Sequence, residues 1–135
     1  MKLFLAIGGF MMVFLSGALP VNAAGVDDLL AQYRMEAGGT FNPEEGKAAW
    51  NRLIPDSKTG EERSCAGCHG SDLRRVGKHV QTGKPIDPMA PSVNAQRLTD
   101  PKFIEKWFKR NCQWTWGREC TPKEKGTFLT FIQNQ

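Results

Sequence analysis

Five residues, Cys65-Ala66-Gly67-Cys68-His69, constrain what this chain can fold around more than any other stretch. Two thiols three positions apart on one turn of distorted helix can reach the two vinyl groups of a single porphyrin, and the imidazole of the next residue can ligate its iron. C-x-x-C-H is for this reason the attachment signature of c-type haem. The sequence predicts one covalently attached haem c, with Cys65 and Cys68 as the thioethers and His69 as the proximal ligand.

Two other interpretations use the same thiol pair. C-x-x-C alone could be a redox dithiol or half of a zinc site. A redox dithiol has no need of the adjacent histidine, and no second thiol pair stands at zinc-finger spacing in the sequence. Haem is the interpretation that uses all three side chains.

The first 23 residues have the pattern of an export signal. Lys2 precedes an apolar run over residues 3–19, and Val21-Asn22-Ala23 supplies the small side chains that a signal peptidase needs. A retained membrane anchor is the alternative, but the run is short and interrupted by glycine. We expect cleavage after Ala23, which leaves residues 24–135 as one mature domain of 112 residues without a permanent anchor. Because haem attachment by thioether takes place outside the cytoplasm, we expect the periplasm.

Charge is unevenly divided along the mature chain. Residues 24–62 carry four basic and eight acidic side chains, whereas residues 63–135 carry thirteen basic and six acidic ones, a net charge of +7. Such a basic segment can simply be solvated surface, and it can also speed the encounter with an acidic redox partner. Nucleic acid is not an expected partner in this compartment.

Helical signals recur along the chain, and no alternating β pattern competes with them. Apolar residues follow helical spacing from Val26, and a capping residue followed by proline stands at Asn42, Asp100 and Thr121. Residues 70–97 are instead rich in glycine and proline, which indicates an irregular loop around one face of the haem. We therefore predict an all-α, class I cytochrome c-like fold of about four to five helices around one haem.

Function depends on what lies on the other side of the iron. A tightly held sixth ligand makes an electron carrier, whereas an open or displaceable position lets small molecules bind. Met89, on the proline-rich loop, is the usual c-type choice, although a methionine can also simply pack on the porphyrin edge. His79, among basic neighbours, has the pattern of a solvated surface histidine. Asn111 is the third candidate for the sixth ligand, and Lys84 is the fourth and weakest.

Asn111 is a weak ligand by type but stands in an unusual setting. Its helix places Ile104, Trp107 and Phe108 on the same face, where an amide has no obvious packing role. Asn111 also directly precedes Cys112, which with Cys120 completes the cysteines of the chain. In an oxidising compartment these two are expected to form a disulfide, and closing so short a loop would contribute roughly 2–3 kcal/mol.

Several motifs together resemble the sphaeroides haem protein (SHP) family of c-type cytochromes, over essentially the whole mature chain. They are Arg110-Asn111-Cys112, Gly117-Arg118-Glu119-Cys120-Thr121, Glu124-Lys125, Thr82-Gly83-Lys84, Ala90-Pro91-Ser92 and Glu105-Lys106-Trp107. The Asn-Cys pair followed by Gly-Arg-x-Cys is particular to that group.

The resemblance implies that Asn111 is the sixth ligand of the ferric haem and leaves on reduction. The ferrous site would then be open to oxygen or nitric oxide, in a pocket that we expect Trp107 and Phe108 to line. The resemblance also implies a Cys112–Cys120 disulfide and a dihaem cytochrome c as electron donor. The first rival is a plain electron-transfer cytochrome with His69 and Met89 as ligands.

An enzyme that turns over oxygen, peroxide or nitric oxide is the second rival. A haem peroxidase needs an acid–base pair, and the sequence offers for this role only His79 and scattered arginines. We therefore rank electron transfer and gas binding above catalysis.

Overall fold

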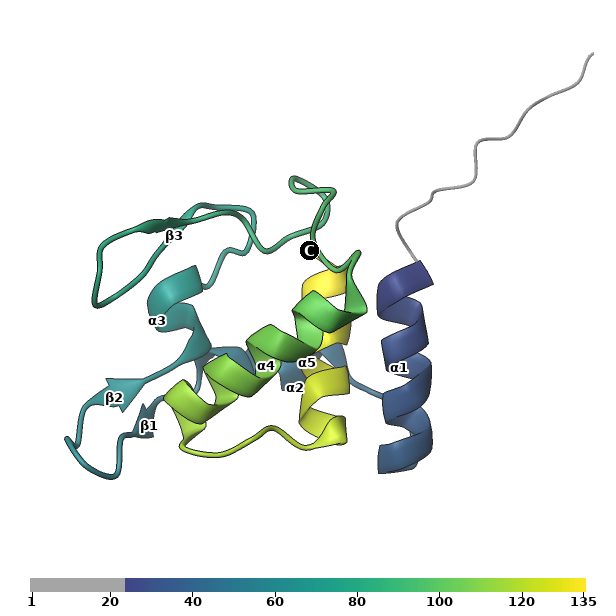
Figure 1. The fold of residues 1–135 in the computed structure, drawn as a ribbon, viewed down its shortest axis with the longest axis horizontal. Helices are drawn as coiled ribbons and strands as arrows, with labels where there is room; N and C mark the ends of the chain where they lie inside the picture. The colour runs from purple at the N-terminus through teal and green to yellow at the C-terminus, as the bar shows by residue number, and fades with distance from the viewer. Residues whose placement is uncertain (1–23) are drawn as a thin grey trace, which may run out of the picture.

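Helices carry most of the fold of residues 24–135, the part of the chain that this computed structural model describes. The predicted signal, residues 1–23, lies outside the described residues. Five helices and two short hairpins follow one another along the described chain (Figure 1): α1 (Ala24–Ala37), α2 (Pro43–Asn51), β1 (Ile54–Pro55), β2 (Glu62–Arg63), α3 (Cys65–His69), β3 (Gly77–Lys78), β4 (Pro85–Ile86), α4 (Pro101–Trp116) and α5 (Pro122–Gln133). The all-α prediction is confirmed.

The three predicted cap-proline starts open α2, α4 and α5. The side chain of Asn42 accepts a hydrogen bond from the Glu44 amide, and that of Asp100 accepts from two amides of the first turn of α4. Thr121 and Glu124 form a reciprocal capping box at the start of α5. In each helix the proline occupies the first turn, where its missing N–H group costs no hydrogen bond.

The core is built where α2 crosses α5. A Cβ atom on Gly46 would lie 2.5 Å from the carbonyl oxygen of Thr127 and 2.6 Å from Cβ of Phe131, so only glycine allows this approach. Trp50 of α2 packs its ring against Phe128 and Phe131, with ring centroids 6.2 Å and 6.0 Å apart. Helix α1 packs on α5 as well, and its buried side chains in the core are Val26, Leu29, Leu30 and Tyr33.

Helix α4 joins this core through one polar cluster and two aromatic contacts. Glu105 accepts hydrogen bonds from Tyr33 of α1 and, at 2.6 Å, from the Lys125 ammonium of α5. Burial and the neighbouring Glu105 carboxylate both raise the pKa of Tyr33, which therefore stays a protonated donor. Phe128 of α5 contacts Phe108 and Trp116 from the same helix α4. Among residues 24–135, no helix is long and apolar enough to cross a membrane.

The structure differs from the sequence prediction in the two loops that flank the haem motif. Strand β1 pairs with β2 before the motif, and β3 pairs with β4 inside the stretch predicted to be irregular, residues 70–97. Each ladder is only two residues long, so neither produces the alternating pattern from which a strand is predicted. Helix α4 continues past Asn111 to Trp116, so Asn111 lies inside the helix.

Candidate haem site

The C-x-x-C-H residues form helix α3, a single turn held by contacts at both of its ends. The Ser64 hydroxyl caps the start and accepts a hydrogen bond from the Gly67 amide at 3.0 Å. At the other end, the indole N–H of Trp50 donates to the carbonyl oxygen of Gly70 at 2.9 Å. The Trp50 ring also lies 5.4 Å from the His69 ring, measured between centroids. The core helix α2 therefore fixes the orientation of the motif.

Strand β3 packs against the backbone of helix α3. A Cβ atom on Gly77 would lie 2.9 Å from Cα of His69 and closer still to the carbonyl oxygen of Cys68. These are backbone atoms that cannot move aside, so the hairpin backbone can pass against α3 only at a glycine. Apart from the glycine itself, no local pattern in the sequence indicates this contact.

The environment of His69 fits an axial ligand of haem iron. Its Nδ1 atom is buried and has no hydrogen-bond partner among residues 24–135. Burial, reinforced by the positive charge of nearby Arg97, lowers the pKa of the imidazole to about 4, so the ring is neutral at pH 7. A metal ligand must be a neutral imidazole. The thiols of Cys65 and Cys68 are both free and half-buried on the same turn, as attachment to one porphyrin requires.

Asn111 lies on the face of α4 that carries the buried residues Ile104 and Thr115. It is three residues after Phe108 and four before Thr115, positions that share one side of a helix. Its side chain is half-buried, and within residues 24–135 it takes part in no hydrogen bond. An amide in this position has an oxygen available to a ligand or a metal, because no protein donor occupies it.

Met89 is pinned beside the segment that follows His69. The amides of Met89 and Ala90 both donate to the carbonyl oxygen of Leu73, each at 2.9 Å, and Leu73 is fully buried four residues after His69. The adjacent carbonyl of Pro88 accepts a hydrogen bond from Arg97, the same cation that lowers the pKa of His69. The backbone of Met89 therefore belongs to the His69 side of the site, and not to α4.

The other two candidate ligands lie on the β3–β4 hairpin. Nδ1 of His79 accepts hydrogen bonds from the amides of Gln81 and Thr82, so the ring caps the hairpin turn. Lys84 is exposed, and its carbonyl oxygen accepts the amide of His79 across the hairpin. The histidine has a local structural role that its sequence neighbours did not reveal.

Two links tie the last turns of α4 to other segments. Cys112 and Cys120 form a disulfide in the structure, with Cα atoms 5.6 Å apart. Arg63, directly before the cap of α3, donates from Nη1 to the carbonyl oxygen of Trp114 at 2.9 Å and lies over the Trp114 ring. Asp56 holds the Arg63 guanidinium at 2.8 Å. The start of the motif and the end of α4 are thereby joined directly.

Trp107 and Phe108, which we expect to line the gas pocket together, differ in how deeply they are buried. Phe108 packs against the core, whereas Trp107 keeps 38% of its surface exposed. The Trp107 ring contacts Phe103 one turn earlier, and the Arg110 guanidinium lies 5.0 Å from its centroid. Trp107 is one turn before Asn111 and so remains a neighbour of the predicted ligand along α4.

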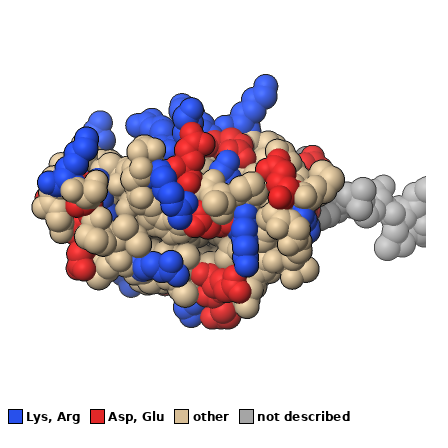
Figure 2. Space-filling model, turned by 90° about the horizontal axis from the view of Figure 1, so that it is seen from below, with Lys and Arg blue, Asp and Glu red and all other residues tan. Residues whose placement is uncertain are grey.

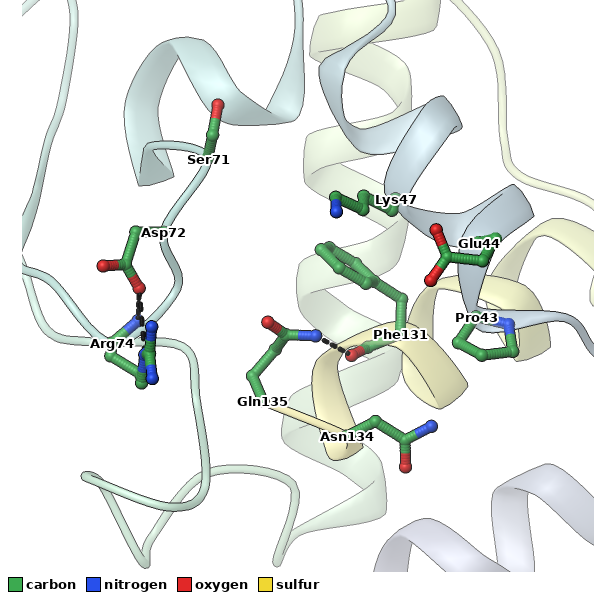
Figure 3. Close-up of a pocket in the computed structure, with 9 residues that line it drawn as sticks. All are labelled: Pro43, Glu44, Lys47, Ser71, Asp72, Arg74, Phe131, Asn134 and Gln135. Carbon is green, nitrogen blue, oxygen red and sulfur yellow. Dashed lines mark hydrogen bonds and ion pairs between the residues drawn. The ribbon is translucent and has the colours of Figure 1, made fainter.

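A cavity of about 460 Å³ lies elsewhere, between the start of α2, the end of α5 and the segment after the motif (Figure 3). Its lining is mostly polar, with Asp72 and Arg74 on one side and Lys47 and the ring of Phe131 on the other. Cys65, Cys68, His69 and Asn111 are not part of it. This cavity is separate from the site that the motif defines.

Trp50, Gly77 and Arg63 are site residues that the sequence analysis did not identify. Arg63 stands directly before Ser64, and Trp50 stands on a predicted helix near the motif, but partners distant in sequence give both residues their roles. Such contacts leave no local pattern in the chain.

This chain is similar to one domain family and to two cytochromes of known structure. A family model described as a domain of unknown function, DUF1924, matches residues 36–132. The cytochrome c-type protein SHP of Cereibacter sphaeroides is 41% identical over 110 residues, which cover 79% of this chain and 81% of that protein. The structure of oxidised SHP, described as an oxygen-binding cytochrome c, superposes with a TM-score of 0.73 at 39% identity, covering 81% of this chain and 96% of the other.

The second cytochrome is cytochrome c'' of Methylophilus methylotrophus. Its solution structure, described as giving insight into the structural basis of haem-ligand detachment, superposes with a TM-score of 0.74 at 31% identity. The match covers 83% of this chain and 94% of the other.

Proposed function

The chain belongs to the SHP family of c-type cytochromes and carries one covalently attached haem c, and from this premise we propose that it is a periplasmic protein that accepts electrons and binds oxygen or nitric oxide. In this proposal Cys65 and Cys68 hold the haem and His69 is the proximal ligand. Asn111 is a distal ligand that leaves when the protein is reduced. The relative SHP is described as oxygen-binding, which supports the gas-binding part.

When bound, the haem would supply an iron that gains or loses one electron and can bind small molecules. The chain's own residues determine which ligands the iron would meet. Burial keeps His69 neutral, and Trp50 and Gly77 restrict the motif that carries it. These residues support a proximal ligand that stays in place in both oxidation states.

The observation that carries the proposal is the side chain of Asn111, half-buried on the inner face of α4 and without a hydrogen-bond partner in the described residues. An amide oxygen is a hard, neutral donor, which ferric iron accepts and ferrous iron favours less than softer partners. Since no protein donor holds the amide, its departure breaks no hydrogen bond. Phe108 and Trp107 are the apolar neighbours that a gas molecule would then meet.

The position of Met89 argues against the electron-transfer rival. Two amide hydrogen bonds to Leu73 hold its backbone on the His69 side. To move towards α4, this segment would have to break both of its hydrogen bonds to the carbonyl oxygen of the buried Leu73. A methionine beside the proximal histidine serves instead to pack against the porphyrin.

Optical spectra of the ferric and ferrous protein test the proposal. With Asn111 as ligand, the ferric protein is low-spin without a thioether charge-transfer band. The ferrous protein is high-spin and binds carbon monoxide without a competing ligand. Asn111→Ala should leave the ferric site high-spin or water-ligated, whereas Met89→Leu, the matched control, should change the spectra little. A low-spin ferrous protein that resists carbon monoxide, and that Met89→Leu disrupts, would establish the rival function.

The compartment and the donor form part of the same proposal. The signal pattern of residues 1–23 and the thioether chemistry of the motif support export to the periplasm. Family resemblance supports a dihaem cytochrome c as the electron donor. Fractionation of cells that produce the full chain tests the first point, since the haem-containing protein should be released with the periplasmic fraction.

A further inference from the structure

The segment of residues 73–86, here called the basic hairpin, contains four cations and no acid. They are Arg74, Arg75, Lys78 and Lys84. All four side chains are exposed. Only Arg74 has an ion-pair partner among the described residues, Asp72, at 3.2 Å. The hairpin therefore presents positive charge that the protein itself does not neutralise.

Elsewhere in the C-terminal half, some cations are paired with acids. Arg118 pairs with Glu124 at 2.7 Å, and Lys125 pairs with Glu105 at 2.6 Å. Seen from below the view of Figure 1, acidic and basic side chains are interspersed over the surface (Figure 2). The basic hairpin extends along the upper side of the molecule in Figure 1, beyond α3. Lys102, Lys106 and Arg110 of α4 are also exposed without an ion-pair partner among the described residues. The hairpin is therefore distinguished by its place beside the haem motif and not by unpaired charge alone.

Exposed apolar surface accompanies this charge. Val76 keeps 63% of its surface exposed and Val80 keeps 54%, and both lie between the cations in sequence. Small apolar side chains close in sequence to exposed cations are suited to a protein partner, because charge steers the encounter and apolar contact holds it briefly. A membrane surface would call for larger apolar side chains than valine.

The hairpin is also in backbone contact with the haem motif. Gly77 of β3 passes against the backbone of Cys68 and His69 so closely that a Cβ atom would not fit. A partner seated on the hairpin is therefore only one layer of backbone away from the proximal ligand. No other exposed segment of residues 24–135 combines unpaired charge with this contact.

We propose that the basic hairpin is the docking surface for an acidic, one-electron donor protein. The inference rests on the proposed electron-accepting function and specifies where the donor binds. The donor loses one electron and the ferric protein gains it, and no atom or proton is transferred. Val76 and Val80 form the apolar centre of the contact, and Arg75, Lys78 and Lys84 its charged rim.

Small redox reagents of opposite charge test the surface without knowledge of the natural donor. The ferrous holoprotein is oxidised by ferricyanide, an anion, or by tris(phenanthroline)cobalt(III), a cation, in a stopped-flow experiment at low ionic strength. Lys78→Glu/Lys84→Glu should slow oxidation by ferricyanide about fivefold and accelerate oxidation by the cobalt complex. Both effects should shrink as salt is added.

Lys58→Glu/Lys123→Glu is the matched control, because it makes the same change of net charge at exposed lysines of the β1–β2 turn and the start of α5. This control should change either rate less than twofold. Equal effects from the two double variants would overturn the proposal, because net charge alone would then explain them.

A binding measurement completes the test. Amide NMR signals of the ¹⁵N-labelled holoprotein should shift on addition of poly-L-glutamate, and the shifts should gather in residues 73–86. Shifts spread over the surface, or binding to phosphatidylglycerol vesicles without binding to poly-L-glutamate, would contradict a protein docking site. Spectra and carbon monoxide binding of the lysine variants should match the wild type. A failure of Asn111 ligation would therefore be recognised separately from a failure of docking.

Discussion

The two sides of the haem site are held in opposite ways. On the His69 side, a cap at Ser64, an indole hydrogen bond from Trp50 and the close approach of Gly77 converge on five residues of α3. On the α4 side, the helix is fixed, but the predicted ligand Asn111 makes no hydrogen bond within the described residues. In the proposed function, the first side keeps its ligand in a single position, whereas the second side lets the proposed ligand Asn111 move by itself.

The comparison indicates where substitutions should matter. Changes on the His69 side should damage folding and haem attachment, because each contact there restrains the motif itself. Changes at Asn111 should affect ligand binding with little effect on stability.

Cys65→Ala/Cys68→Ala should remove covalent haem and leave little folded protein, because the core loses a large apolar body together with both thioethers. Extraction with acidified acetone should release all haem from the variant and none from the wild type. Cys112→Ser/Cys120→Ser is the control that removes two cysteines and keeps covalent haem. A double alanine variant with normal haem content and stability would refute the assignment.

Gly77→Ala should destabilise the holoprotein by about 2–3 kcal/mol, since the new methyl group meets backbone atoms of Cys68 and His69 that cannot relax. Denaturant unfolding monitored by the haem band measures the change. Gly67→Ala is the matched control inside the motif, where the nearest atom to a new Cβ is the Ser64 hydroxyl oxygen at 3.6 Å. If both variants unfold alike, the contact between β3 and α3 is not restrictive.

Cys112→Ser/Cys120→Ser should lower the free energy of unfolding by roughly 2–3 kcal/mol through loss of the short loop closure. Mass spectrometry without reductant should find no free thiol in the mature wild-type protein. The ferric spectrum should change little, and ligand exchange should change more, because α4 loses one of its two ties near Asn111. Quantitative alkylation of both cysteines in the native protein would exclude the disulfide.

Asn111→Ala should change the stability of the ferrous protein by less than about 0.5 kcal/mol, because the side chain gives up no hydrogen bond. The ferric protein should lose more, since only there does the side chain act as a ligand. Unfolding of the variant and the wild type in both oxidation states measures the difference. An equal loss in the two states would mean that Asn111 is structural, and the contrast between the two sides would fail.

Local sequence signals predicted the framework of this molecule well. The cap-proline starts of α2, α4 and α5 and the one-turn motif helix are decided by residues next to one another, so the chain displays them directly. The apolar spacing of Val26 and the residues after it likewise identified α1. The all-α fold and the haem follow from these patterns.

Contacts between distant residues were not predictable in the same way. Nothing near Met89 shows that its amide bonds to Leu73, and nothing near Arg63 shows that it reaches Trp114. The short hairpins were not predicted, because a strand of two residues is too short to show the alternating apolar and polar pattern of a β-strand. Roles of Asn111, Cys65, Cys68 and His69 remain predictions that the experiments above can test.

Helix α4 is tied on both sides of Asn111, by Glu105 towards its start and by Arg63 and the disulfide towards its end. Such a helix cannot swing or slide as a rigid body without breaking one of these ties. If Asn111 leaves the iron on reduction as we propose, its departure needs only rotation about its own side-chain bonds, which takes picoseconds to nanoseconds rather than the microseconds or longer of helix motion. After flash reduction, gas binding should follow a single concentration-dependent phase, without a lag from conformational gating.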